Sequence, residues 1–258
     1  MSWTTDQDHP FAGIAEKLKR ADQNIVNLHT EIAAFYKSGN YPLVPHPNDE
    51  TWQEAVDYHR SNRIPLRFSV LAGEIVHHLR SSLDHITWHF SDNAYRIEDP
   101  NGIEFPVFEV KPDPSDKNAV KRYNRKIKGI ANTQVLAWIE LMQPYNVGAD
   151  MADDPLLIIH NMDRFDKHRE LAIVDPSAII EFPSEMPDIA KKAALYTQGK
   201  LPTTEHLALS RALKEHAKVT PSVAFRQFGN RQTHPVIAGL VELLNEVNTL
   251  VGIFATKT

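Results

Sequence analysis

The chain has 258 residues, of which 42% are hydrophobic, so it is long enough to bury a sizeable core. A formal net charge of -5 at pH 7 argues against a broad basic surface for nucleic acids, although a small local basic site is compatible with it. The sequence contains no cysteine, which excludes disulfides, thiolate catalysis and cysteine-ligated metal centres. Histidines and carboxylates are therefore the candidate reactive groups.

The first predicted element is a long helix over residues 11–35. Its apolar side chains recur at alternating steps of three and four, Pro10 can occupy the first helical position, and a following glycine can end the helix. A proline-rich connection comes next, and alternating apolar side chains at residues 51–60 favour an edge strand over a short helix. Pro65 then opens a central helix that we expect to run to about Tyr95.

The second half of the chain alternates between helical and extended patterns. Asp154 and Pro155 are typical of a helix start, and Pro235 begins a final helix. Two apolar runs, residues 171–174 and 178–182, flank an Asp-Pro-Ser turn and predict a small hairpin. The other expected elements are helices near residues 135–142, 187–198 and 204–216 and a strand at residues 219–228.

These elements predict a mainly α fold, an up-and-down helical bundle with a small antiparallel β appendage. We expect a single helical-bundle domain over residues 1–258, with a small β-containing insertion around residues 171–230. The N-terminus lacks the basic start and apolar run of a secretory leader, and acidic and amide residues interrupt the apolar segment Val236 to Ala255. We therefore expect a soluble cytoplasmic protein with no membrane segment.

Most of the candidate chemistry lies in the central helix, where LAGEIVHHLRSSLDHITWHF at residues 71–90 sets four histidines, an arginine and two carboxylates beside an apolar stripe. Arg80 and His85 form an R-x4-H pattern. Histidine changes protonation near neutral pH and can deprotonate an RNA 2′-hydroxyl, while a guanidinium can stabilise the phosphorane. Asp84 would orient one of the two. Because five residues turn a helix by about 140°, a composite site needs a kink or a second subunit.

A structural role for Arg80 is an equally open interpretation. Its guanidinium can pair with Asp84 one turn away, or bridge to Glu74 or His77 through neighbouring turns. The R-x4-H pattern also recurs at residues 211–216, so the spacing alone is not specific.

A metal site is a further alternative for the same helix. His85 and His89 have the four-residue spacing of two ligands on one helical face, and His160 or Asp163 could supply a third. Such a site would belong to a metal-dependent hydrolase in a helical bundle. The R-x4-H interpretation, in contrast, needs no metal and no cofactor.

Basic side chains outside the central helix are candidates for contacting phosphate. Residues 117–128 form a basic run that includes Arg122 and Arg125 beside an aromatic residue, a combination suited to single-stranded nucleic acid but also to a solvated helix face.

The helix that begins at Pro155 has a basic end at Lys167, His168 and Arg169. These side chains can interact with the helix dipole, or complete a phosphate site in which Asp163 or Asp166 orients a histidine.

Longer strings of the sequence resemble a known family. GEIVHHLRSSLDHITWHF, EFPVF, QPY, IIHNMDRFDKHREL and FGN before a helix that begins PVI resemble a family of uncharacterised bacterial proteins whose central helix reads close to HNLRSALDHL and whose later helix ends in DKHR. The likeness runs from about Gly73 to the C-terminus. The central helix is also similar to the HEPN superfamily of helical bundles. Its members often act as dimeric, metal-independent endoribonucleases in toxin–antitoxin and antiphage systems, and others only bind nucleotides or nucleic acid.

The resemblance implies that Arg80 and His85 occupy the positions of the motif's arginine and histidine. We therefore expect a HEPN-like metal-independent endoribonuclease or RNA-binding protein, a homodimer with a toxin or antiphage role and no cofactor. Its catalytic residues would be Arg80, His85 and Asp84. Its RNA or phosphate contacts would be His78, Lys167, His168, Arg169, Arg122 and Arg125. The alternatives are the metal-dependent hydrolase and a non-catalytic nucleotide-binding or structural protein.

Overall fold

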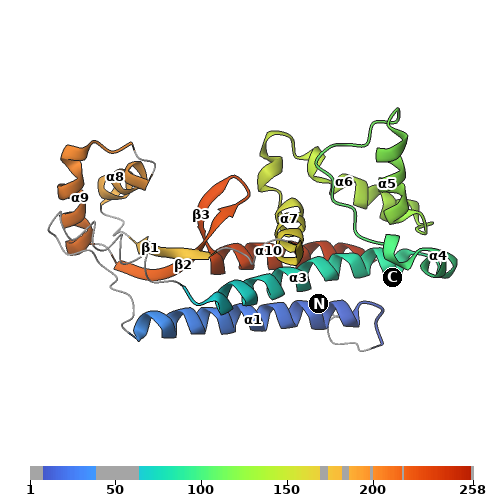
Figure 1. The fold of residues 1–258 in the computed structure, drawn as a ribbon, viewed down its shortest axis with the longest axis horizontal. Helices are drawn as coiled ribbons and strands as arrows, with labels where there is room; N and C mark the ends of the chain where they lie inside the picture. The colour runs from blue at the N-terminus through green and yellow to red at the C-terminus, as the bar shows by residue number, and fades with distance from the viewer. Residues whose placement is uncertain are drawn as a thin grey trace.

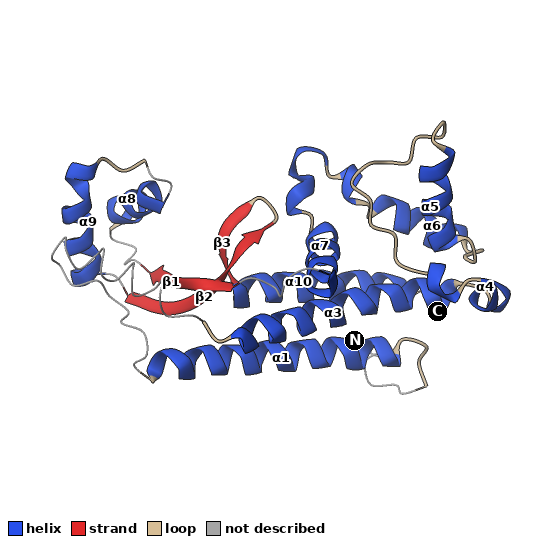
Figure 2. Cartoon of the chain, viewed as in Figure 1, coloured by secondary structure: helices blue, strands red, loops and turns tan. Residues whose placement is uncertain are grey.

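A computed structural model describes residues 8–38, 64–168, 174–181, 186–197, 200–216 and 218–256. These residues are mainly helical, with a small antiparallel sheet, as the sequence predicts (Figures 1 and 2). The edge strand expected at residues 51–60 lies outside the described residues.

Three long helices build the core: α1 (Ala12–Lys37), α3 (Leu66–Phe90) and α10 (Val236–Ala255). They lie side by side in Figure 1, and each contacts the other two. α1 runs antiparallel to α3, since Arg67 at the start of α3 pairs with Glu31 near the end of α1. The apolar stripe that the sequence places at steps of three and four is the buried stripe of each helix.

The central helix ends earlier than expected. It stops at Phe90, because Ser91 has an extended backbone and forms an isolated β-bridge with Ile130. Asp92 then accepts a hydrogen bond from the backbone N–H of Tyr95 and caps a separate short helix, α4 (Asn93–Glu98). The prediction that one helix continues to Tyr95 is therefore wrong, because the helix breaks at Ser91.

A second group of helices covers one side of the three-helix core. α7 (Pro155–His168) crosses α3 and α10, while α5 (Lys117–Ile127) and α6 (Thr133–Leu141) lie beyond it, toward the C-terminal end of α3 (Figure 1). The close approach of α7 to α3 depends on Gly73, where an added Cβ would lie 2.5 Å from Oδ1 of Asp166. Short 3-10 helices occur at Pro100–Gly102, Pro144–Asn146 and Gly148–Asp153.

The sheet has the order β1-β2-β3 and is antiparallel throughout, with strands β1 (Val174–Glu181), β2 (Lys218–Phe228) and β3 (Arg231–Pro235). Gly229, at φ +61°, turns the chain from β2 into β3. Helices α8 (Pro187–Thr197) and α9 (Thr203–His216) connect β1 to β2.

The hairpin predicted within residues 171–182 is wrong, because Asp175 to Ser177 belong to the single strand β1. β1 is an edge strand, so the missing N–H of Pro176 can face away from the ladder. β3, which the sequence did not reveal, supplies the second strand of the actual hairpin.

α10 is the one helix among the described residues that is long and apolar enough to cross a membrane, at a mean hydropathy of 1.5. Its buried face, which includes Leu240, Val247 and Phe254, packs against α1 and α3.

Candidate functional site

α3 is the only one of the three core helices whose unburied side is rich in histidine. Between α1 on one side and α7 on the other it presents an outward face that consists of Glu74, His77, Ser81, His85 and Trp88, all exposed or half-buried. The side chains that border α7 and those that border α1 differ in burial and in their charged neighbours.

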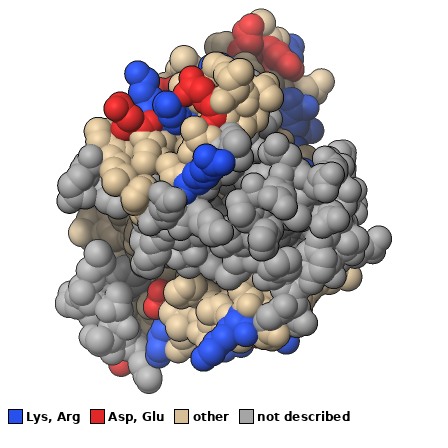
Figure 3. Space-filling view, turned by 90° about the vertical axis from the view of Figure 1, so that its left-hand side faces the viewer, with Lys and Arg blue, Asp and Glu red and all other residues tan. Residues whose placement is uncertain are grey.

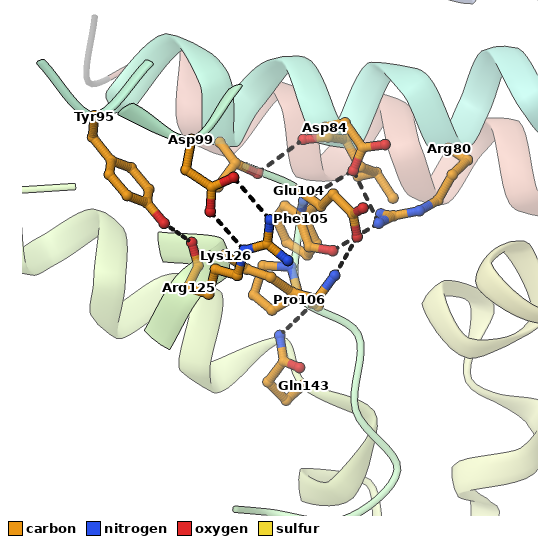
Figure 4. A network of polar contacts seen from close by, with 12 residues as sticks. Arg80, Asp84, Tyr95, Asp99, Glu104, Phe105, Pro106, Arg125, Lys126 and Gln143 are labelled. Carbon is orange, nitrogen blue, oxygen red and sulfur yellow. Dashed lines mark hydrogen bonds and ion pairs between the residues drawn. The ribbon is translucent and has the colours of Figure 1, made fainter. Parts of the chain in front are cut away.

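Arg80 lies on the α7 side and is almost completely enclosed, with 5% of its side chain exposed. Its Nη2 pairs with Oδ1 of Asp84 at 2.9 Å and donates to the carbonyl of Phe105 at 2.9 Å. The backbone N–H of Phe105 donates back to Oδ1 of Asp84 at 2.9 Å (Figure 4). The two side chains therefore clamp an extended segment of chain to α3, which is the structural role that the sequence left open.

Opposite charges continue around this clamp. Lys126 of α5 hydrogen-bonds to Glu104, next to Phe105 (Figure 4). Burial would raise the pKa of Glu104, but Lys126, with smaller contributions from Arg80 and His160, holds it below its usual value. The pKa of Asp84 is raised, because its burial outweighs the attraction of Arg80 and the Phe105 N–H.

Three of the six basic side chains at residues 117–128, Lys126 among them, have carboxylate partners. Arg125 pairs with Asp99 through two hydrogen bonds of 2.6 and 2.8 Å, and Lys128 pairs with Glu98 at 2.8 Å. The expectation that Arg125 contacts phosphate is therefore not supported by its placement, since its guanidinium already has a carboxylate partner. Arg122 on the same helix is exposed.

His160 of α7 faces the clamp and not His85. Burial, with the positive charges of Arg80 and Lys126, lowers its pKa from 6.5 to about 4. His89 lies on the opposite side of α3, where its ring packs edge-on against Phe11 at 5.2 Å. Among the residues that the structure describes, no three His, Cys, Asp or Glu side chains come together as a metal site, so the alternative site of His85, His89 and His160 is not formed.

His77 is held by a carboxylate from α7. Its Nδ1 lies 3.0 Å from Oδ1 of Asp163, whose side chain is 9% exposed, whereas 51% of the His77 side chain is exposed. An aspartate of α7 therefore holds a histidine of α3, while the phosphate site of which the sequence made this contact a part stays a prediction. A hydrogen bond to the carboxylate places a proton on Nδ1 and fixes the ring, with Nε2 as its other proton-transfer atom.

His78, the next residue, faces α1. Partial burial lowers its pKa below 6.5, and the charges of Lys17, His77 and Arg20 lower it further. The pKa of His85, two turns along α3, is also lowered, first by burial and then by Lys17. These two imidazoles are therefore neutral at pH 7, beside two cations of α1.

The rings of His77 and His78 lie 6.5 Å apart, centroid to centroid, with an interplanar angle of 43°. A carboxylate lies beside one ring, and two cations lie near the other. Neighbouring histidines in such opposite surroundings are suited to opposite roles in proton transfer.

Arg80 and His85 do not meet within one chain, as the rotation between them along the helix predicts, because Arg80 is enclosed on the α7 side while His85 is exposed on the outward face near Lys17. A composite site between two subunits stays a prediction. Lys167 and His168 belong to the last turn of α7, but their side chains and all of Arg169 lie outside the described residues.

Sequence reasoning missed Lys17, Arg20 and the proton-transfer potential of His77. A signal for the first two was present, since two cations three residues apart border the apolar stripe of the first predicted helix.

Viewed from the side that carries α8 and α9, Lys and Arg lie interspersed with Asp and Glu among the described residues (Figure 3).

Comparison with known proteins finds no matching family model, no matching curated protein and no matching solved structure. The HEPN relationship stays a prediction.

Proposed function

We propose that the protein binds RNA on the outward face of α3 and cleaves it without a metal ion. The observation that carries this proposal is the neighbouring pair of His77 and His78, one held by Asp163 and the other beside Lys17 and Arg20. The proposal retains the class of activity expected from the sequence but assigns it to a different histidine pair.

The two imidazoles divide the proton transfers. Neutral His78 accepts the proton of a ribose 2′-hydroxyl, and the 2′-oxygen attacks the adjacent phosphorus. His77, whose ring is held by Asp163, gives a proton to the departing 5′-oxygen. The products are a 2′,3′-cyclic phosphate and a free 5′-hydroxyl.

Lys17 and Arg20 supply the positive charge for the phosphorane. Cations placed where charge develops stabilise a transition state more than a ground state. Arg80 does not act on the phosphate in this scheme, because its side chain is enclosed on the α7 side, where its Nη2 binds Asp84 and Phe105. It is a positioning residue for the segment that packs on α3.

The site forms within one chain, so the second subunit that a pairing of Arg80 with His85 requires is not needed. A homodimer, and the toxin or antiphage role, remain predictions of the sequence.

The test is cleavage of a labelled single-stranded RNA, with and without EDTA, by the wild type and single variants. We expect EDTA-insensitive cleavage that falls roughly 10²- to 10⁴-fold in His77→Ala and in His78→Ala. Asp163→Asn should lower the rate less and alter its pH profile, because it removes the charge that holds His77 but keeps a similar shape.

His29→Ala is the matched control, since it removes an exposed histidine from α1. Thermal unfolding of each variant shows whether the fold is kept. Cleavage that EDTA abolishes, or that persists unchanged in both His77→Ala and His78→Ala, would contradict the proposal.

A further inference from the structure

Trp88 is a large aromatic side chain on the outward face of α3, which includes His77 and lies next to His78. It is 40% exposed, although an indole is usually among the more buried side chains. It lies three residues beyond His85, so the two side chains are neighbours on the surface of α3. Counted along the helix, it is about 15 Å beyond His78.

The ring of Trp88 is accompanied by a fixed cation. The guanidinium carbon of Arg96 lies 5.5 Å from the ring centroid. Arg96 is held there by three hydrogen bonds: Nε to the carbonyl of Trp88 at 2.9 Å, Nη2 to the carbonyl of His89 at 2.6 Å and Nη1 to Oδ1 of Asn93 at 3.1 Å. The short helix α4, which begins where α3 breaks, therefore presents a positive charge beside an exposed indole.

An exposed aromatic ring beside a fixed cation, in line with phosphate-directed side chains, has the composition of a platform for an unpaired base. Single-stranded nucleic acid is bound by stacking of its bases on aromatic side chains while cations follow its backbone. A base inside a duplex is already stacked on both faces and cannot lie on an indole without being unpaired.

We propose that Trp88 is the base-stacking subsite of the outward face, so that the ligand is single-stranded RNA several nucleotides long. The inference rests on the proposed function, because it assumes that RNA lies along this face of α3. The strand places a phosphate between His77 and His78, passes His85 and Lys17, and stacks a base on Trp88 beside Arg96.

The distance along the helix makes the proposal specific about ligand length. A dinucleotide held at the histidine pair is too short to reach Trp88, roughly 15 Å away. A single strand of ten nucleotides reaches it. Trp88 should therefore matter for the long single strand and not for the dinucleotide.

The experiment measures the affinity of the full chain by fluorescence anisotropy. Three 2′-fluoro RNA probes, which lack the attacking hydroxyl, are compared: a ten-nucleotide single strand of mixed sequence, its blunt duplex and a dinucleotide. Stacking contributes about 1–3 kcal/mol per base, so Trp88→Ala should weaken binding of the single strand by about 5- to 150-fold. Trp88→Phe should retain most of the affinity, and the dinucleotide should bind both variants like the wild type.

Ile97→Ala is the matched control, because it removes an 83% exposed apolar side chain from the adjacent helix α4. Unchanged single-strand affinity in Trp88→Ala would overturn the stacking subsite, as would an equal loss for all three probes. If Lys17→Ala weakens binding of the single strand and Trp88→Ala does not, the stacking subsite fails and the proposed function stands. If the wild type binds none of the probes, both fail.

Discussion

The polar side chains on two sides of α3 differ in how deeply they are buried and in whether they are paired. On the α7 side, Arg80 is enclosed and bound to a carboxylate and a backbone carbonyl. On the outward face, His77 is half exposed, and His78 and His85 border the cations of α1. The charged side chains on the α7 side join α3 to a neighbouring segment, whereas the histidines of the other side remain available for proton transfer at the surface.

This difference shows why residue type alone does not identify a site. A guanidinium stabilises a phosphorane only if its donors are free to meet it, and a buried pair that already satisfies its neighbours contributes to packing instead. Arg125, although exposed, likewise has its guanidinium bound to the carboxylate of Asp99.

The largest expected effect on stability comes from breaking the clamp on the α7 side. Arg80→Ala leaves the buried carboxylate of Asp84 and the carbonyl of Phe105 without their partner, so we expect a loss of about 3 kcal/mol in the free energy of unfolding. Urea denaturation at pH 7 measures it. The double variant Arg80→Leu with Asp84→Asn should lose less, because no unpaired charge remains. A loss below about 1 kcal/mol in Arg80→Ala would show that the clamp is not structural.

A smaller effect is expected from the buried imidazole beside the clamp. The folded protein lowers the pKa of His160 to about 4, whereas 6.5 is its ordinary value. The unfolded chain therefore takes up the proton first as the pH falls. The stability that neutral His160 contributes is complete above pH 6.5 and is lost as the pH falls through about 4.

We expect the free energy of unfolding to fall by about 1–2 kcal/mol from this group over that interval. His160→Gln should flatten the dependence, which urea denaturation at pH 7, 5.5 and 4.5 would reveal. The matched variant is His29→Gln on the exposed side of α1. If His160→Gln and His29→Gln show the same pH dependence as the wild type, the enclosure of His160 does not affect stability.

The smallest expected effect on stability comes from a surface ion pair. Arg125 and Asp99 form a two-bonded ion pair, but 55% of the Arg125 side chain is exposed, so solvent screens the attraction. Arg125→Gln should leave the free energy of unfolding nearly unchanged in urea denaturation. If Arg125→Gln shifts the melting temperature as much as Arg80→Ala does, the surface ion pair and the enclosed clamp do not differ in their contribution to stability.

The amino-acid sequence by itself determined the framework. The spacing of apolar residues in the first, central and last helices predicts α1, α3 and α10, because an amphipathic stripe has one way to be buried in a bundle. Capping and proline signals at Asp154 and Pro155 likewise predict the start of α7. The break after Phe90 escaped prediction, since it depends on a bridge from Ser91 to Ile130, 39 residues away.

Only the tertiary structure decided which side chains share a site. Arg80 and His85 are close in the sequence, yet neighbouring elements enclose the former and leave the latter at the surface. His77 meets Asp163 from a helix 86 residues away, and His78 lies beside cations of α1. The physical reason is that pairing and desolvation depend on what packs against a helix, and no local pattern along the helix contains that information.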